Sequence, residues 1–110
     1  MFSRLKTSVW ATALMRRAET KGAFAFIIHK GDPDAGAALL KVRLLNGKAV
    51  LYRPMRDISG NRNWLPKGPL IEDEIDAMIA KRLEMDPDIW VIEIEDRDGR
   101  HFLTEPVEDS

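Results

Sequence analysis

The sequence has 110 residues, the usual size of one domain, and 45% of them are hydrophobic, which suffices for one core. The absence of cysteine excludes disulfides, thiolate zinc sites and cysteine nucleophiles, and no stretch is apolar and long enough for a signal peptide or a membrane span. The formal net charge of −1 excludes a uniformly basic or acidic protein, and together these features predict a cytoplasmic location.

The first predicted element is a helix over residues 8–21, which Gly22 ends as the residue after the C-cap. Its apolar side chains cover a wide arc at 100° per residue, and they are Val9, Trp10, Ala11, Ala13, Leu14, Met15 and Ala18. An arc this wide exceeds what one contact with a sheet requires. It indicates that a second surface covers the helix, and a homodimer through this helix is our first interpretation.

Three strands are predicted next, over residues 23–29, 37–45 and 49–53. In the first of them, Phe24, Phe26 and Ile28 share one face by the two-residue period of a strand, and we predict that this face lies in the core. Both residues of the Asn-Gly pair between the second and third strands accept positive φ, which predicts a hairpin. We therefore expect the three strands to form an antiparallel meander.

Residues 54–69 contain three prolines and two glycines and are predicted to form a loop that is longer than most. A second helix is predicted over residues 71–85, because acidic residues fill its first turn and Pro87 ends it. A fourth strand, over residues 89–95, follows it and places alternate apolar residues on one face.

Asp98-Gly99 predicts a turn into a short strand over residues 101–103, which completes a single domain of residues 1–103. The acidic tail of residues 104–110 is expected to fray. The element order α-β-β-β-α-β-β predicts the α+β class, with an antiparallel β-meander and two helices packed on the sheet. The predicted core consists of Trp10, Leu14, Phe24, Phe26, Ile28, Leu40, Val42, Leu44, Ile75, Ile79, Trp90, Ile92 and Ile94.

The segment 29–36, with the sequence HKGDPDAG, is open to two interpretations. His29, Asp32 and Asp34 are metal ligands by type, and a metal site would require all three to converge. Glycine supplies positive φ, proline fixes φ and aspartate bonds its own backbone, so a turn between two strands also explains every residue. We favour the turn and regard His29 as a half-buried strand residue. A second Asp-Pro-Asp at residues 86–88 is interpreted as a separate turn.

Positive charge gathers in the first part of the chain, where residues 1–67 carry 13 Lys and Arg against four Asp and Glu, while residues 68–110 carry four against 14. The candidate binding residues are Arg53, Arg56, Arg62, Trp64 and Lys67. Cations beside an exposed aromatic ring could hold a phosphate or stack a base, which predicts nucleic-acid or nucleotide binding. The alternative, which we favour, is that Trp64 folds onto the core and the two halves of the chain neutralise each other.

Recognisable catalytic motifs are absent, including the P-loop, the dinucleotide fingerprint, the His-Glu-x-x-His zinc motif and the nucleophile elbow. The order α-β-β-β-α-β resembles the core of restriction-endonuclease-like nucleases, and Pro33-Asp34 enters the second predicted strand as their motif does. The third predicted strand lacks the Asp/Glu-x-Lys of that family, so a metal-dependent hydrolase is the least favoured interpretation. We assign no catalytic residue and no cofactor. The order also resembles that of double-stranded-RNA-binding domains, although topology alone does not establish function.

Three blocks of the sequence together resemble a family of small bacterial proteins that is classed only as a domain of unknown function. They are RLKTSVWATALMRR at 4–17, HKGDPDAGAALLKV at 29–42 and DPDIWVIEIEDRDGRHFL at 86–103. The resemblance implies a soluble, single-domain bacterial protein, and it carries over no catalytic residue, cofactor or partner.

We expect a small, soluble, non-enzymatic interaction or regulatory module with a protein partner that the sequence does not identify. Nucleic-acid or nucleotide binding through residues 53–67 is the alternative, and no membrane partner is expected.

Overall fold

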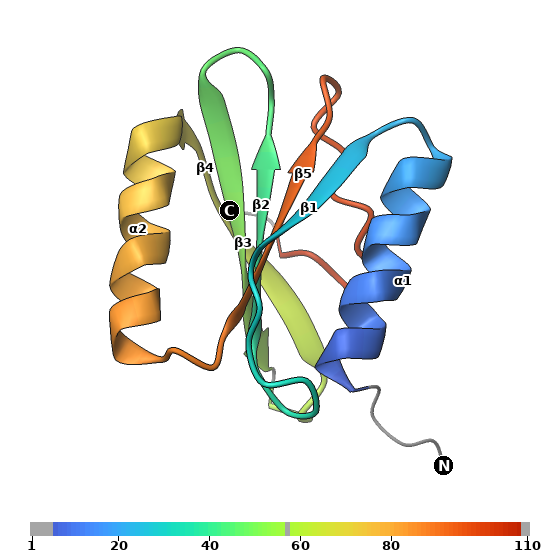
Figure 1. Ribbon diagram of the computed structural model, residues 1–110, viewed down its shortest axis with the longest axis vertical. Coiled ribbons are helices and arrows are strands. Elements are labelled where there is room, and N and C mark those ends of the chain that lie inside the picture. Colours follow the sequence, from blue (N-terminus) through green and yellow to red (C-terminus); the bar gives the residue numbers. More distant parts are fainter. Residues whose placement is uncertain (1–5, 57, 109–110) are drawn as a thin grey trace.

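The computed structural model describes residues 6–56 and 58–108, and it consists of two helices packed on one mixed five-stranded sheet (Figure 1). The predicted α+β class is confirmed. The elements in chain order are α1 (Thr7–Thr20), β1 (Phe24–His29), β2 (Ala38–Arg43), β3 (Lys48–Arg56), β4 (Arg62–Ile71), α2 (Glu72–Met85) and β5 (Trp90–Glu95). Parts of the predicted domain 1–103 and of the predicted tail 104–110, namely residues 1–5, 57 and 109–110, lie outside the described residues.

The strand order in the sheet is β1-β5-β2-β3-β4, and β5 runs parallel to β2 and antiparallel to β1. Strands β2, β3 and β4 form an antiparallel meander, but β1 is separated from β2 by β5, so the meander predicted for the first three strands is wrong at β1. The physical reason is the composition of β5. Val91 and Ile92 on its opposite faces are both fully buried, and a strand that is apolar on both faces is stabilised at the centre of a sheet.

The loop predicted over residues 54–69 is also wrong, because β3 continues to Arg56 and β4 begins at Arg62. Prolines remove backbone donors, but β4 is the last strand of the sheet, where such donors need no partner strand. The register between β3 and β4 is irregular between Ala49 and Leu51, opposite the Gly68-Pro69 peptide. Pro66 and Pro69 therefore mark an edge strand with a bulge, whereas Pro54 lies in β3 beyond Tyr52, where the pairing of β3 with β2 ends.

The end of the described chain packs against the same hairpin. The backbone N–H of Trp64 donates to the carbonyl of Pro106, and the N–H of Glu108 donates to the carbonyl of Trp64. Residues 101–103, predicted as a short strand, lie outside all five strands. Phe102 has a φ of 61°, a left-handed backbone conformation that a strand does not accept.

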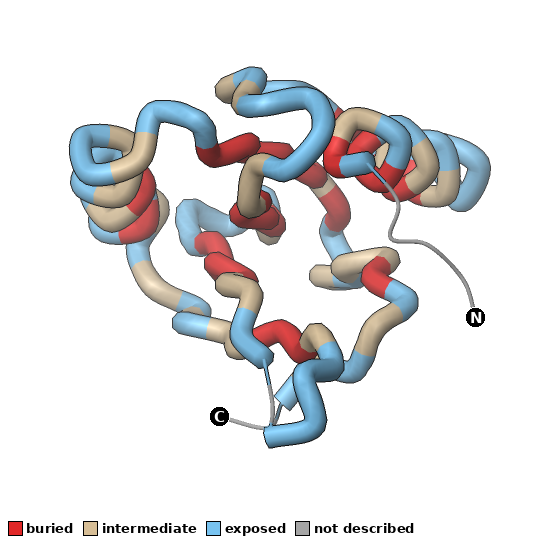
Figure 2. The backbone as a smooth tube through the Cα atoms, turned by 90° about the horizontal axis from the view of Figure 1, so that it is seen from below, coloured by how far each residue is buried: buried red, intermediate tan, exposed pale blue. Residues whose placement is uncertain are grey.

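Two apolar cores lie on opposite faces of the sheet (Figure 2). One joins α1 to the sheet and includes Trp10, Leu14, Leu40, Val42, Tyr52, Trp64, Trp90, Ile92 and Ile94. The other joins α2 to the sheet and includes Leu39, Leu51, Ile75, Ile79, Ile89 and Val91. Of the predicted core, Leu44 is only partly buried, and it packs at the margin of the first of these cores.

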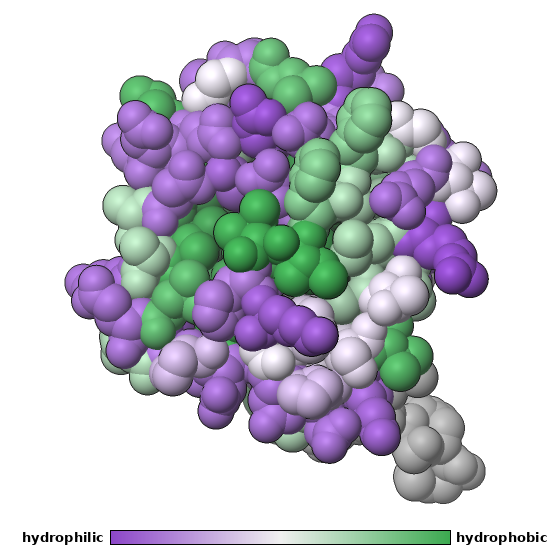
Figure 3. All heavy atoms as spheres, viewed as in Figure 1, coloured by the Kyte–Doolittle hydropathy of each residue, from purple (hydrophilic) through white to green (hydrophobic). Residues whose placement is uncertain are grey.

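The prediction of burial is wrong for three core residues, because Phe24, Phe26 and Ile28 are 63%, 43% and 53% exposed. The predicted alternation in β1 is correct, but the buried face is the small one, where Ala23 and Ala25 pack under α1. Helix α2 packs on β2, β3 and β4 and leaves β1 uncovered. Figure 3, in the orientation of Figure 1, shows apolar side chains at the surface in the region of β1.

Candidate functional site

The segment that raised the metal question is a turn in the structure. Both the Asp34 and Ala35 backbone N–H groups donate to Asp32 Oδ1, at 2.9 and 3.1 Å, which is the bonding of an aspartate-initiated turn. These two hydrogen bonds also lower the pKa of Asp32. His29 Nδ1 lies 2.9 Å from the carbonyl oxygen of Ile89. Within residues 6–56 and 58–108, no group of three or more His, Asp or Glu side chains is placed to hold a metal ion.

The β1–β2 turn holds other parts of the fold in place. The Asp32 N–H donates to the carbonyl of Asp88 at 2.9 Å, so the two Asp-Pro-Asp turns pack against each other. The indole of Trp90 donates to the carbonyl of Asp32 at 2.7 Å. A Cβ on Gly31 or Gly36 would overlap the Asp88 carbonyl oxygen, which explains why glycine occupies both positions.

The same turn also fixes the start of α1. Thr7 Oγ1 donates to the carbonyl of Gly36 at 2.6 Å, and the Ser8 N–H donates to the carbonyl of Pro33 at 3.0 Å. The β1–β2 turn therefore makes hydrogen bonds to the start of α1, to the turn at residues 86–88 and to Trp90 of β5.

The five candidate binding residues do not form one surface. Leu51 belongs to the core under α2, and Lys67 lies directly opposite it, so Lys67 and Arg53 are on the α2 side of the sheet. Arg56 and Arg62 are paired across the hairpin on the other side of the sheet. The hairpin thus places the four predicted cations on two opposite faces.

Trp64 is fully buried, as the favoured interpretation predicts. Its ring stacks on Trp10 with centroids 5.5 Å apart, and its Nε1 donates to Glu105 at 3.2 Å. Because the ring is enclosed, it is not available to stack on a base. Arg56 and Arg62 instead line a pocket of about 430 Å³ together with Lys6 and Asp34.

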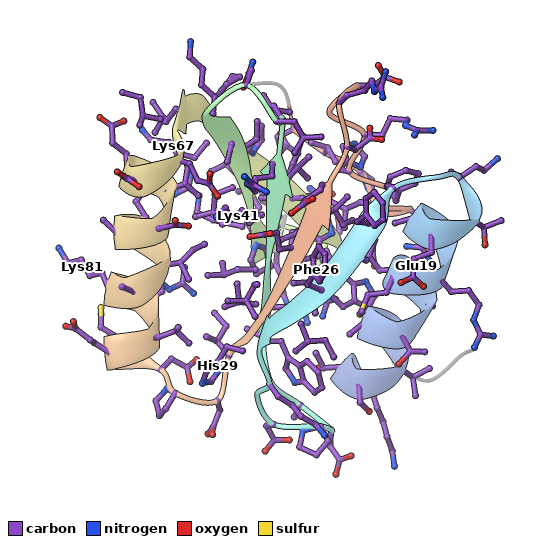
Figure 4. All side chains as sticks on the ribbon, turned by 45° about the horizontal axis from the view of Figure 1, so that its top comes forward. Glu19, Phe26, His29, Lys41, Lys67 and Lys81 are labelled. Atoms are coloured by element: carbon purple, nitrogen blue, oxygen red, sulfur yellow. The ribbon has the colours of Figure 1, made fainter. Side chains whose placement is uncertain are left out.

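An ion network lies between the sheet and α2 (Figure 4), and it pairs cations of the basic first part of the chain with carboxylates of the acidic second part, as the favoured interpretation expects, although its residues were not named from the sequence. The Lys41 side chain is only 4% exposed, and its Nζ lies 2.7 Å from Glu72, 2.6 Å from Asp76 and 3.3 Å from Glu93. Burial alone lowers the pKa of Lys41, but the hydrogen bonds to Asp76 and Glu72 and the charge of Glu93 outweigh it, so the pKa lies above its ordinary value. The lysine is therefore a permanent cation, which suits a structural ion pair.

A groove runs along α1, between the helix and residues 102–104, which lie beside it (Figure 1). Its volume is about 760 Å³, within the range of ligand sites in proteins. Val9, Ala13, Phe102 and Leu103 form its apolar lining. The charged residues that line it are Arg16, Arg17 and Lys21, all of them basic.

The wall of the groove opposite α1 is fixed by contacts to Phe102. Arg17 donates through Nε and Nη2 to the Phe102 carbonyl at 3.0 and 2.9 Å, which holds this residue in its left-handed conformation. The Arg100 guanidinium lies 5.0 Å from the centre of the Phe102 ring, and Asp96 fixes Arg100 by an ion pair at 2.8 Å. The groove is therefore formed by ordered parts of the fold.

His101 directly precedes the groove residue Phe102, and it makes the stability of the fold depend on pH. Its Nδ1 accepts a hydrogen bond from the Leu103 N–H at 2.9 Å, and its ring packs edge-on against Tyr52. Burial lowers the pKa of His101 below its ordinary value of 6.5. As the pH falls through 6.5, His101 becomes protonated in the unfolded chain but stays neutral in the folded chain, because its pKa there is lower. Protonation therefore favours the unfolded state, and the fold loses stability at lower pH.

We expect His101→Gln to reduce the loss of stability between pH 7.5 and pH 5, because glutamine does not titrate in this range. Urea unfolding of the variant and the parent at both pH values measures the difference. A His29→Gln variant is the matched control. Equal loss in the parent and in the His101 variant would contradict the proposed linkage.

The signals for this groove were only partly present in the sequence. The wide apolar arc predicted a second covering surface on the first helix, and Val9, 48% exposed, lies on its uncovered part. Nothing local predicted that Phe102 faces the helix, because Arg17 reaches it from 85 residues away. No helix in the described part of the chain is long and apolar enough to cross a membrane.

Comparison with known proteins places these features in a family. The family model of DUF1491, described as a protein of unknown function, matches residues 5–104. A search of curated proteins finds no match.

Solved structures of similar proteins cover almost the whole chain. A crystal structure of a DUF1491 family protein from Caulobacter crescentus CB15 is 50% identical, with a TM-score of 0.90, and covers 96% of this chain and 100% of its own. An NMR structure of a DUF1491 family protein from the same organism is 48% identical, with a TM-score of 0.87 and coverage of 98% and 100%. The solution structure of protein Atu0922 from A. tumefaciens is 29% identical, with a TM-score of 0.82 and coverage of 98% and 99%.

Proposed function

We propose that this chain, which belongs to the DUF1491 family of proteins of unknown function, is a non-enzymatic interaction module that binds an acidic amphipathic helix of a partner protein in the groove along α1. The observation that carries the proposal is the lining of the groove, which combines apolar side chains with charged residues of one sign. An amphipathic helix that lays its apolar face into a hydrophobic groove is a recurring mode of recognition.

The length of the groove supports a helical partner. Its lining includes residues from Ser8 to Lys21, which cover the full length of α1. Fourteen helical residues at 1.5 Å each span about 20 Å, so a partner helix of three to four turns matches the groove.

The charge of the lining supports an acidic partner and argues against a second copy in this groove. In a symmetric contact between two copies, neither groove lining would supply an acidic residue to pair with Arg16, Arg17 and Lys21 of the other copy, and unpaired charges in an interface are unfavourable. The predicted homodimer through the first helix is therefore not the occupant that we propose. Concavity favours an inserted helix over the flat surface of an anionic membrane.

We expect a synthetic helical peptide of about 15 residues, with leucine on one face and glutamate on the flanks, to bind in the groove. In two-dimensional NMR of the labelled protein, the amide signals of Val9, Ala13 and Thr104 should shift on titration. A peptide with the same leucines and lysine flanks should cause no shift, because Arg16 and Lys21 repel it.

Two variants complete this experiment. Ala13→Glu should weaken binding of the acidic peptide at least about tenfold, because it places a like charge on the apolar floor. Ile58→Glu, at a fully exposed position outside the groove, should leave binding unchanged. Equal binding of both peptides, or shifts of the groove signals with anionic lipid vesicles alone, would contradict the proposal.

Nucleic-acid binding through Arg53, Arg56, Arg62, Trp64 and Lys67 stays a prediction, and the geometry favours it less. The enclosed ring of Trp64 and the division of the cations between two faces remove the combination on which that prediction rested. A metal site at His29, Asp32 and Asp34 is not proposed, because Asp32 bonds the backbone of its own turn.

A further inference from the structure

Strand β1 is an edge strand, and within residues 6–56 and 58–108 no strand pairs with its outer edge. Four of its six residues are large apolar side chains that remain 43–63% exposed, namely Phe24, Phe26, Ile27 and Ile28. Their exposure is on both faces of the strand, because Ile27 alternates with the other three. Figure 4 shows the labelled Phe26 on β1, away from α2.

An exposed apolar edge strand is ordinarily blunted by a charged residue, a proline or a bulge. From Phe24 to Ile28 the strand contains neither a charged residue nor a proline, and its register with β5 is regular until a shift between Ile27 and His29. A strand of this kind is a template for pairing with another strand.

We propose that β1 pairs with β1 of a second copy of this chain, antiparallel and with the two-fold axis at Phe26. The apolar run is symmetric about this residue, so Phe26 meets its own counterpart and Phe24 lies opposite Ile28 of the second copy. Cross-strand pairs of aromatic and β-branched side chains are among the favourable ones in antiparallel sheets. The two five-stranded sheets then form one continuous sheet.

The charges beside β1 permit this contact. Glu95 and Glu93 lie opposite Phe24 and Phe26 on the neighbouring strand. Glu95 is paired with Arg43 at 2.7 Å, and Glu93 is paired with Lys41 at 3.3 Å, so each carboxylate has a cation on the inner side of the sheet, which it shares with acidic residues of α2. The two carboxylates that lie opposite the aromatic rings on β5 are therefore both ion-paired when a second copy approaches.

The exposed area indicates a reversible dimer. The four side chains together expose roughly 400 Å² per copy, when aromatic side chains are taken at about 150–250 Å² each. A stable interface buries about 800 Å² per partner, so the dimer belongs to the weak and concentration-dependent class. This contact is separate from the groove along α1, and either can fail without the other.

Sedimentation equilibrium of the intact protein at concentrations up to about 1 mM tests the proposal. The mass is expected to rise from 12.5 kDa toward twice that value. Phe26→Lys, which places like charges opposite each other, should raise the dimer dissociation constant at least about tenfold. Met85→Lys, at a 76% exposed position on α2, is the matched control and should leave the constant unchanged. A mass of 12.5 kDa throughout would overturn the proposal.

Single-cysteine cross-linking locates the contact, because the natural chain has no cysteine. Phe26→Cys should form a disulfide-linked dimer under mild oxidation, since residue 26 lies on the axis. Ile58→Cys, more exposed and outside β1, should cross-link much more slowly. Equal rates for the two variants, or a dimer that Ala13→Glu abolishes and Phe26→Lys does not, would also overturn the proposal.

Discussion

Replacing Trp64 by alanine is expected to lower the free energy of unfolding by about 3–5 kcal/mol, the usual cost of removing a fully buried tryptophan. The ring is completely enclosed, it stacks on Trp10, and its indole donates to Glu105. The loss of the ring also leaves Trp10 without its stacking partner. Urea unfolding at pH 7 measures the change, and the slope against urea should stay unchanged if the native fold persists.

Arg62→Ala is the matched control for this variant, because Arg62 is two residues away on the same strand and only partly buried. A change within about 0.5 kcal/mol is expected for it. If Trp64→Ala cost less than about 1 kcal/mol while it abolished binding of a single-stranded oligonucleotide, the tryptophan would be a binding residue and our structural interpretation would be wrong.

Lys41→Ala is expected to destabilise the fold by about 3 kcal/mol, the low end of the cost of leaving buried charges without their partner. We take the low end because the Asp76 side chain is half exposed, and water screens part of its charge. Glu72, Asp76 and Glu93 would then face one another without their shared cation. Lys41→Met should cost nearly as much, although methionine preserves most of the packing.

The pH dependence of the free energy of unfolding separates the loss of charge pairing from the loss of packing in the Lys41→Met variant. The hydrogen bond from Lys41 lowers the pKa of Glu72 below its ordinary value of 4.5. The interaction between Lys41 and ionised Glu72 therefore stabilises the fold above pH 4.5, and this contribution is lost as the pH falls through the lowered pKa of Glu72. Chemical unfolding between pH 7 and pH 3 should show that the difference between parent and Lys41→Met shrinks at low pH. A constant difference would assign the cost to packing alone.

The alternating pattern of a strand predicts which residues share a face, but it does not say which face is covered. In β1 the sequence pattern favoured burial of the phenylalanines, whereas the structure buries Ala23 and Ala25 because small residues let α1 approach the sheet. Which face of β1 is buried depends on the position of β5 in the sheet and on the strands that α2 covers, and both are set by residues far away along the chain.

Proline content misled the prediction for β4 for a related reason. Prolines in a central strand would remove ladder hydrogen bonds, but the edge position of β4 makes Pro66 and Pro69 acceptable. Edge position is a property of the whole sheet, so the local sequence could not supply it.

The turn at residues 29–36 was predictable because its chemistry is local, and Asp32 bonds residues two and three positions further on. The groove was not predictable in the same way. Its wall depends on the contact between Arg17 and Phe102 and on the left-handed backbone at Phe102, neither of which leaves a local signal. Only the excess width of the apolar arc on the first helix indicated that the sheet leaves part of this helix uncovered.

The most direct test of the interaction module is a selection of binders from a random peptide library displayed on phage, with the intact protein as bait. We predict enrichment of peptides that place apolar residues at helical spacing and acidic residues beside them, and loss of their binding to the Ala13→Glu variant. Enrichment of basic or purely apolar peptides, or of peptides that bind the Ala13→Glu variant equally well, would contradict the assignment of the groove along α1 as the binding site.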